Sequence, residues 1–210
     1  MSDKQIPYYF TITSPWSYLG HAPFLKLADE LGYEVQFKPV DFGAVFAQSG
    51  GLPLPKRPYQ RRRYRMFELQ RWRDYRQADL NIRPKHFPVD PTLGNNMVMI
   101  AAEQGLDAGK LATAFMRGCW VDEQDMGDKA ALIAAANSAG LDGAAIATEA
   151  ESSAAKARAD VLTEEAKTAQ VFGAPTYIIR GEPFWGQDRL ELVERAMRGQ
   201  APAYAVEEPF

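Results

Sequence analysis

The stretch FTITSPWSYLG, residues 10–20, decides the fold class because it passes from a strand-like to a helix-like pattern within a few residues. Residues 8–13 are all aromatic or β-branched, which predicts a buried strand. Ser14 and Pro15 follow at once. Serine is a preferred helix N-cap, and proline is favoured at the first helical position. The sequence therefore predicts a strand that runs directly into a helix.

The chain beyond this junction completes a β-α-β unit. Apolar residues at helical spacing continue the helix to Leu31, and Gly32 is expected to cap it. Residues 34–40 then predict a second strand. Two strands joined by a helix of this length are expected to lie parallel.

The middle of the chain is expected to be helical and to lack strands. Residues 43–58 are rich in glycine and proline and predict a loop, whereas aromatic residues at helical spacing predict a helix over 59–78. Three prolines make residues 81–91 an irregular connection, and an alanine-rich helical block follows to about residue 170. The expected helix starts are Asp90, Asp107, Asp128 and Asp142, and the expected stops are Gly105, Gly118 and Gly140.

The end of the chain returns to an α/β pattern. Residues 176–180 predict a short strand, Gly181 and Glu182 a tight turn, and residues 183–185 a partner strand, with a helix from Gln187 onward. The whole order is βαβ, then helices, then ββα. This order predicts an α/β fold, with a thioredoxin-like core interrupted by an inserted all-helical domain.

The two expected domains share one chain of 210 residues. We expect a discontinuous thioredoxin-like domain over residues 1–42 and 168–201, and the inserted helical domain over residues 43–167. A chain of this length buries enough apolar surface to fold without disulfides.

Composition narrows the class of protein. Hydrophobic residues make up 46% of the chain and charged residues 24%, as in ordinary globular proteins. The single cysteine, Cys119, cannot form an internal disulfide, which suits a cytoplasmic location. The sequence predicts neither a signal peptide nor a membrane span, and its net charge of −3 argues against a general nucleic-acid binder.

Basic residues gather in one segment. Residues 56–76 hold nine of the 24 lysines and arginines, against only Glu68 and Asp74. Three interpretations remain open: a solvated helix face, a rim for an anionic ligand, or a stripe for nucleic acid.

The motif Ser14-Pro15-Trp16-Ser17 lies where the first helix begins. The backbone N–H groups of a first helical turn lack acceptors within the helix, and together with the helix dipole they stabilise an anion such as a thiolate. Redox proteins of this architecture carry a Cys-x-x-Cys pair here. Ser14 and Ser17 cannot form a disulfide, but a serine hydroxyl can donate to the thiolate of a ligand. The alternative is that Ser14 only caps the helix.

Two motifs near the end complete the candidate site. Ala174-Pro175 precedes a strand; a proline there can be cis, and in thioredoxin-like folds it faces the first helix and leaves the preceding backbone free to pair with a peptide-like ligand. Trp185-Gly186-Gln187-Asp188 begins the last helix, where free N–H groups suit a carboxylate and Asp188 suits an ammonium group. An ordinary loop proline and an ordinary helix cap remain the alternatives.

Taken together, the motifs resemble one family. FTITSPWSYLG and VFGAPTYIIRGEPFWGQDRLELVE, residues 171–194, resemble the 2-hydroxychromene-2-carboxylate isomerases. These enzymes are relatives of kappa-class glutathione transferases within the DsbA-like thioredoxin group. The resemblance spans about residues 6–198 and includes LQRW at 69–72.

The resemblance implies a glutathione-dependent enzyme. It implies that Ser14 lies at the glutathione sulfur and is catalytic, and that Ala174, beside Pro175, pairs with the glutathione backbone. It implies that the γ-glutamyl end is held by Trp185, Gly186, Gln187 and Asp188. The implied reaction is a cis–trans isomerisation in aromatic degradation by reversible thiolate addition, with glutathione as a cofactor. A homodimer is implied as well.

The implied second partner is an aromatic carboxylate. Lys56 and Arg57 are its expected anion partners because guanidinium groups bind carboxylates bidentately. Phe87 is expected to line the pocket, and Asn95 and its neighbour Asn96 are expected to reach the cleft. Phe46 falls where a relative can have lysine, which leaves the substrate open.

Two other functions remain open beside the isomerase. A kappa-like glutathione transferase or peroxidase would share the same thiolate site. A redox-inactive thioredoxin-like binding module would bind no glutathione. Among the remaining residues, His21 and Cys119 are expected to be structural, His86 is as consistent with loop packing as with the pocket, and the sequence shows no metal-ligand cluster.

Overall fold

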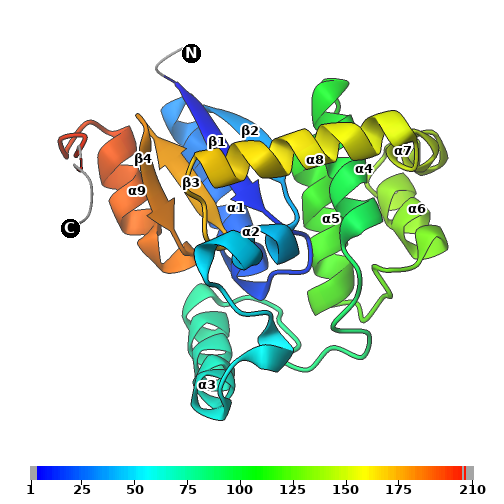
Figure 1. Cartoon of the computed structure of the whole chain (residues 1–210), viewed down its shortest axis with the longest axis horizontal. Coiled ribbons are helices and arrows are strands. Elements are labelled where there is room, and N and C mark those ends of the chain that lie inside the picture. Colours follow the sequence, from blue (N-terminus) through cyan, green and yellow to red (C-terminus); the bar gives the residue numbers. More distant parts are fainter. Residues whose placement is uncertain (1–3, 205, 207–210) are drawn as a thin grey trace.

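The computed structural model describes residues 4–204 and residue 206, and it builds a four-stranded mixed sheet in the order β2-β1-β3-β4 (Figure 1). The strands are β1 (Gln5–Phe10), β2 (Glu34–Pro39), β3 (Thr176–Ile179) and β4 (Glu182–Trp185). β1 pairs in parallel with β2, and antiparallel pairing joins β1 to β3 and β3 to β4. The expected α/β thioredoxin-like fold is confirmed.

The first helix begins where its capping chemistry predicts. α1 (Pro15–Leu31) is capped by Ser14, whose side chain accepts the N–H of Ser17, and it ends at Gly32, which has a φ of 66°. β1 ends at Phe10, three residues earlier than expected. Residues 11–13 instead form a short connection that carries Ser14 away from the sheet.

The segment expected to be a loop contains a helix. α2 (Phe42–Ser49) is capped by Asp41, whose carboxylate accepts the N–H of Gly43 at 2.7 Å. Its Phe42 and Val45 pack with Tyr9 in a second small core. The loop prediction was wrong there because this cap and this burial outweigh the glycine-rich composition.

Seven further helices and two single turns cover the sheet and extend to one side of it. They are η1 (Leu54–Lys56), α3 (Tyr59–Arg76), α4 (Thr92–Glu103), α5 (Ala108–Trp120), α6 (Lys129–Ser138), α7 (Gly143–Ala150), α8 (Ser153–Thr168), η2 (Gln187–Arg189) and α9 (Leu190–Met197). In Figure 1, α4 to α7 gather on one side of the sheet, α9 lies on the other, and α3 extends below it. Among the described residues, no helix is both long and apolar enough to cross a membrane.

The helix boundaries of the middle block follow its aspartates. Asp107, Asp128 and Asp142 cap α5, α6 and α7 as expected, each accepting a backbone N–H three residues on. Asp90 accepts the N–H of Thr92, the first residue of α4. Gly118, an expected stop, instead lies inside α5, so this expectation was wrong. A side chain at this position would collide with the sulfur of Met126, which accounts for the glycine.

One apolar core runs through the sheet, α1 and the helical block. It contains Tyr8 and Phe10 of β1 together with Ile100 of α4 and Leu111 of α5. The rings of Tyr8 and Phe10 stack 4.5 Å apart, and Tyr8 also stacks on Tyr177 of β3. The helical block and the sheet therefore share one core. The division into two domains stays a prediction.

Candidate functional site

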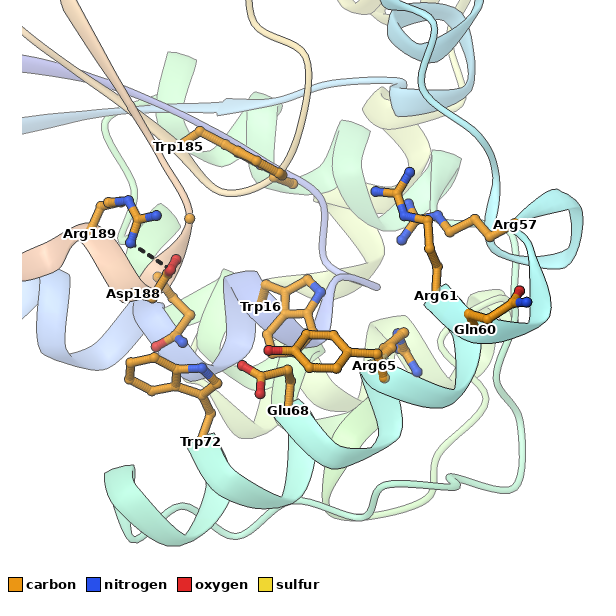
Figure 2. Close-up of a pocket in the computed structure, with 14 residues that line it drawn as sticks. Trp16, Arg57, Gln60, Arg61, Arg65, Glu68, Trp72, Trp185, Asp188 and Arg189 are labelled. Atoms are coloured by element: carbon orange, nitrogen blue, oxygen red, sulfur yellow. Dashed lines mark hydrogen bonds and ion pairs between the residues drawn. The ribbon is translucent and has the colours of Figure 1, made fainter.

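Two adjoining cavities open where α1 begins. Chamber A, of about 550 Å³, lies between α3 and the segment 185–189 (Figure 2). Chamber B, of about 580 Å³, lies between Ser14, α2 and residues 87–89. Six residues line both chambers: Trp16, Arg57, Arg61, Arg65, Ala174 and Trp185. Together the chambers have the size of a site for two small molecules.

Ser14 lies in the wall of chamber B, at the start of α1. Its Oγ accepts the N–H of Ser17 at 3.1 Å, so its own proton is free to be donated to another group. The backbone N–H of Trp16, in the first turn, has no acceptor among the hydrogen bonds of the described residues. A hydroxyl and an unpaired N–H at a helix N-terminus form an anion site that suits a thiolate.

The Ala174–Pro175 peptide bond is cis, as the sequence allowed. Ala174 lines both chambers, and none of the hydrogen bonds between described residues involves its backbone N–H or C=O. The carbonyl of Pro175 accepts the N–H of Gly186 at 2.9 Å, which ties this segment to β4. Ala174 therefore offers one free donor and one free acceptor to an extended peptide.

The segment 185–188 forms one wall of chamber A. Trp185 is half exposed over the chamber, and Asp188 is paired with Arg189 at 2.7 Å. Gln187 lines the chamber although it is largely buried, and its Oε1 accepts a hydrogen bond from the Nε of Arg76 at 3.2 Å. This bond joins α3 to the start of α9 and occupies the amide oxygen. Contact of Gln187 with a ligand stays a prediction.

The expected substrate residues separate into two groups. Arg57 and Phe87 line chamber B. Lys56 is exposed and lines neither chamber, because η1 turns it outward. Asn95 is buried, and its Oδ1 accepts the backbone N–H of Ile12 at 3.1 Å. It holds the connection before Ser14 instead of reaching the cleft, so the expectation of substrate contact is corrected.

Asn96 is likewise buried, and it donates to the carbonyl of Ala150 on α7. It lines neither chamber. The expectation that it reaches the cleft is therefore corrected as well.

Sequence reasoning missed the face that α3 presents to the chambers. Arg61, Arg65, Glu68 and Trp72 all line chamber A from this helix (Figure 2). Their spacing of three or four residues places them on one side, and the basic segment carried this signal. The pKa of Glu68 lies below its usual value because Arg71 donates to its carboxylate. The lowered pKa favours the charged carboxylate form of Glu68. Glu68 and Asp188 line chamber A from opposite walls.

The two histidines and the cysteine lie outside both chambers. His21 is buried, and its Nε2 donates to the carbonyl of Gly109 while its Nδ1 accepts from the Tyr8 hydroxyl. Burial lowers the pKa of His21 to about 4 and raises that of Cys119 to about 12. His86 faces Asp125, 3.6 Å away. No metal-ligand cluster occurs among residues 4–204.

Comparisons with known proteins agree with this geometry. The DSBA-like thioredoxin domain family matches residues 5–198. The chain is 28% identical over 198 residues to a 2-hydroxychromene-2-carboxylate isomerase of Pseudomonas sp. (strain C18), covering 92% of this chain and 90% of that protein. It is 27% identical over 193 residues to an enzyme of the same name from Sphingobium xenophagum, covering 91% and 96%.

A solved structure gives the same result. The chain superposes on a 2-hydroxychromene-2-carboxylate isomerase with a TM-score of 0.76 and 25% identity, covering 93% of this chain and 95% of that one. The resemblance expected from the two terminal motifs is confirmed.

Proposed function

The chain belongs to the DSBA-like thioredoxin domain family, and we propose that it is a glutathione-dependent isomerase of 2-hydroxychromene-2-carboxylate or a similar aromatic intermediate. One observation carries the glutathione part of this proposal. The hydroxyl of Ser14, the free N–H of Trp16 and the unpaired backbone of Ala174 all line one cleft. A peptide that carries a thiol needs hydrogen-bond donors for its thiolate and an unpaired backbone segment for its own peptide groups.

The residues present fit glutathione along its length. Ala174 can pair with the peptide backbone, and Trp185 covers it. Asp188, paired with Arg189, and Glu68, paired with Arg71, both line chamber A, and each carboxylate keeps further lone pairs that suit the ammonium group of the γ-glutamyl end. Gly186, with a φ of 107°, has a backbone conformation that favours glycine, and a side chain there would meet the Asp188 carboxylate. Chamber B is then left for the aromatic substrate.

When bound, glutathione supplies a thiolate that adds reversibly to the conjugated double bond and so permits rotation about it. The part of this chain is to hold that sulfur as an anion. Ser14 donates a hydrogen bond to it, and the first turn of α1 adds the N–H of Trp16 and the positive end of its dipole. His21 takes no part, because it is buried, neutral and already bonded at both nitrogens.

The side chains at the start of α1 cannot carry out a thiol–disulfide redox cycle. Ser14 and Ser17 stand where a disulfide would be, and Cys119 is buried with a raised pKa. The expected homodimer and cytoplasmic location stay predictions.

A spectrophotometric assay tests the proposed function. Purified protein is mixed with 2-hydroxychromene-2-carboxylate, with and without glutathione, and with a chloro-nitrobenzene electrophile in a parallel reaction. The proposal predicts isomerisation that requires glutathione but does not consume it. Faster conjugation of the electrophile than isomerisation would favour a kappa-like transferase. Absence of glutathione binding in calorimetry would favour the binding module.

A further inference from the structure

Three arginines meet where chambers A and B join. Arg61 and Arg65 lie one turn apart on α3 and so share one side of the helix, and Arg57 lies in the segment just before it. Each lines both chambers, and Figure 2 shows all three at chamber A. Burial is the main cause that lowers the pKa of Arg57 and of Arg65, and the charge of Arg61 on Arg57 and of Arg57 on Arg65 lowers each further.

The three charges have no counter-ion in the fold. None of the ion pairs among residues 4–204 includes Arg57, Arg61 or Arg65. Glu68, the acidic residue on the same helix face, is already paired with Arg71 at 2.6 Å. Arg61 is exposed, but Arg57 and Arg65 are partly buried, and charges that lose water without a partner raise the free energy of the fold. A bound anion would offset this cost.

Two of the guanidinium groups are fixed against aromatic rings. Arg65 lies 5.7 Å from the ring centre of Phe87, and burial lowers its pKa to about 10. Arg57 lies 5.9 Å from the ring centre of Phe46 and donates its Nε to the carbonyl of Leu52 at 2.7 Å. Phe46 and Phe87 both line chamber B. The walls of this chamber therefore combine flat apolar rings with oriented cations.

We propose that Arg57, Arg61 and Arg65 form a subsite for the 2-oxo acid end of the substrate. In this subsite Arg57 and Arg61 bind the carboxylate, and Arg65, the more buried cation beside Phe87, binds the adjacent 2-oxo oxygen. This inference rests on the proposed function, since it concerns the second substrate of that reaction. A planar guanidinium matches the two neighbouring oxygens of a 2-oxo acid better than a lysine would.

The chemistry of the substrate explains why such a subsite helps. 2-Hydroxychromene-2-carboxylate is a cyclic hemiketal, and opening of its ring gives an aryl 2-oxo-3-enoate. A nucleophile that adds to the aryl-bearing carbon forms one bond there and moves the π electron pair onto the 2-oxo oxygen. Its expulsion reverses both changes, with no net transfer of protons or electrons. A guanidinium group at that oxygen stabilises the charge that develops on it.

The first test measures binding without glutathione. Calorimetry would compare 2-oxo-4-(2-hydroxyphenyl)butanoate, which has no double bond to react, with the ketone 4-(2-hydroxyphenyl)butan-2-one, which lacks the carboxylate. We expect the wild-type protein to prefer the oxo acid by on the order of tenfold or more, as for a charge-assisted pair. Arg57→Gln and Arg65→Gln should remove this preference. Arg62→Gln, a change at an exposed arginine that lines neither chamber, should retain it.

The second test measures turnover with saturating glutathione. Arg65→Gln should lower kcat about 100-fold, as loss of a donor to a developing oxyanion does, whereas Arg57→Gln should mainly raise KM. Arg65→Lys should restore part of kcat. Arg62→Gln should behave as the wild type.

The outcomes separate this inference from the proposed function. If Arg65→Gln and Arg62→Gln bind the oxo acid equally well, the subsite is wrong even when the enzyme isomerises its substrate. If Arg65→Gln instead weakens glutathione itself, the cluster serves the cofactor, and the inference is overturned. If the wild-type protein binds the oxo acid through these arginines but shows no glutathione-dependent turnover, the proposed function fails and the subsite stands.

Discussion

At the residue scale, the site depends on a serine that has two roles at once. The oxygen of Ser14 accepts the N–H of Ser17 and so caps α1, while its proton remains available to a ligand. A cysteine in its place would supply the sulfur itself. With serine there, the sulfur must arrive with a ligand, and the free N–H of Trp16 shows where it would lie.

Ser14→Ala should separate catalysis from binding. The change removes one donor to the sulfur anion, so we expect kcat to fall about 100-fold, corresponding to roughly 2.7 kcal/mol. The affinity for glutathione should change little, because Ala174 and the 185–188 segment are untouched. Steady-state kinetics and calorimetry measure the two quantities. Ser138→Ala, at an exposed serine of α6, is the control. Unchanged turnover in Ser14→Ala would remove the catalytic role.

His21 should give the fold a measurable pH dependence. Its pKa is about 4 in the folded protein, below the ordinary 6.5, so only the unfolded chain binds its proton between these values. The free energy of unfolding should therefore fall as the pH drops from 6.5 to 4 and level off below, by roughly 3 kcal/mol from this group. Urea unfolding across this range measures it. His21→Gln, which cannot be protonated, should show a shallower decline; equal slopes would contradict the assignment.

At the scale of elements, α3 supplies a wall of the site although little of its surface packs on the rest of the molecule. Leu69 is its only buried residue among the 18 of the helix, and Arg76 anchors its end to Gln187. It nevertheless supplies arginines to both chambers. A helix with so little buried surface lies at the low end of local stability.

Hydrogen exchange should show that α3 is less stable locally than the well-buried helix α5. We expect the amides of α3 to exchange much faster than those of α5, which is buried along most of one face, and to slow when glutathione is added. Mass spectrometry of the two helices in one sample provides an internal control. Exchange in α3 that is unaffected by glutathione would mean that the ligand does not contact this wall.

The helices also differ in how far the sequence could predict them. The ends of α1 and of the middle helices followed from Ser14, Asp107 and Gly32, because capping is a local interaction. Helix α2 was missed since its stability comes from packing on Tyr9, which is distant in the chain. The position of Asn95 was misjudged for the same reason, because its side chain is held by Ile12 and Thr11, which are distant in the chain.

At the scale of the whole molecule, the sheet and the helical block share one apolar core. Their apolar residues form a single cluster, in which Tyr8 of β1 and Leu111 of α5 both take part. Unfolding should therefore be one cooperative transition, with coincident curves by circular dichroism and tryptophan fluorescence. Two separate transitions would support independent domains.

The central claim is that a glutathione thiolate rests at the N-terminus of α1 against Ser14. Ultraviolet titration of the thiolate in the bound complex tests it most directly, with the Ser14→Ala protein measured in parallel. We predict that the bound thiol has a pKa well below about 8.5, the ordinary value for a thiol, and that Ser14→Ala raises it. A bound thiol that titrates like free glutathione in both proteins would contradict the account.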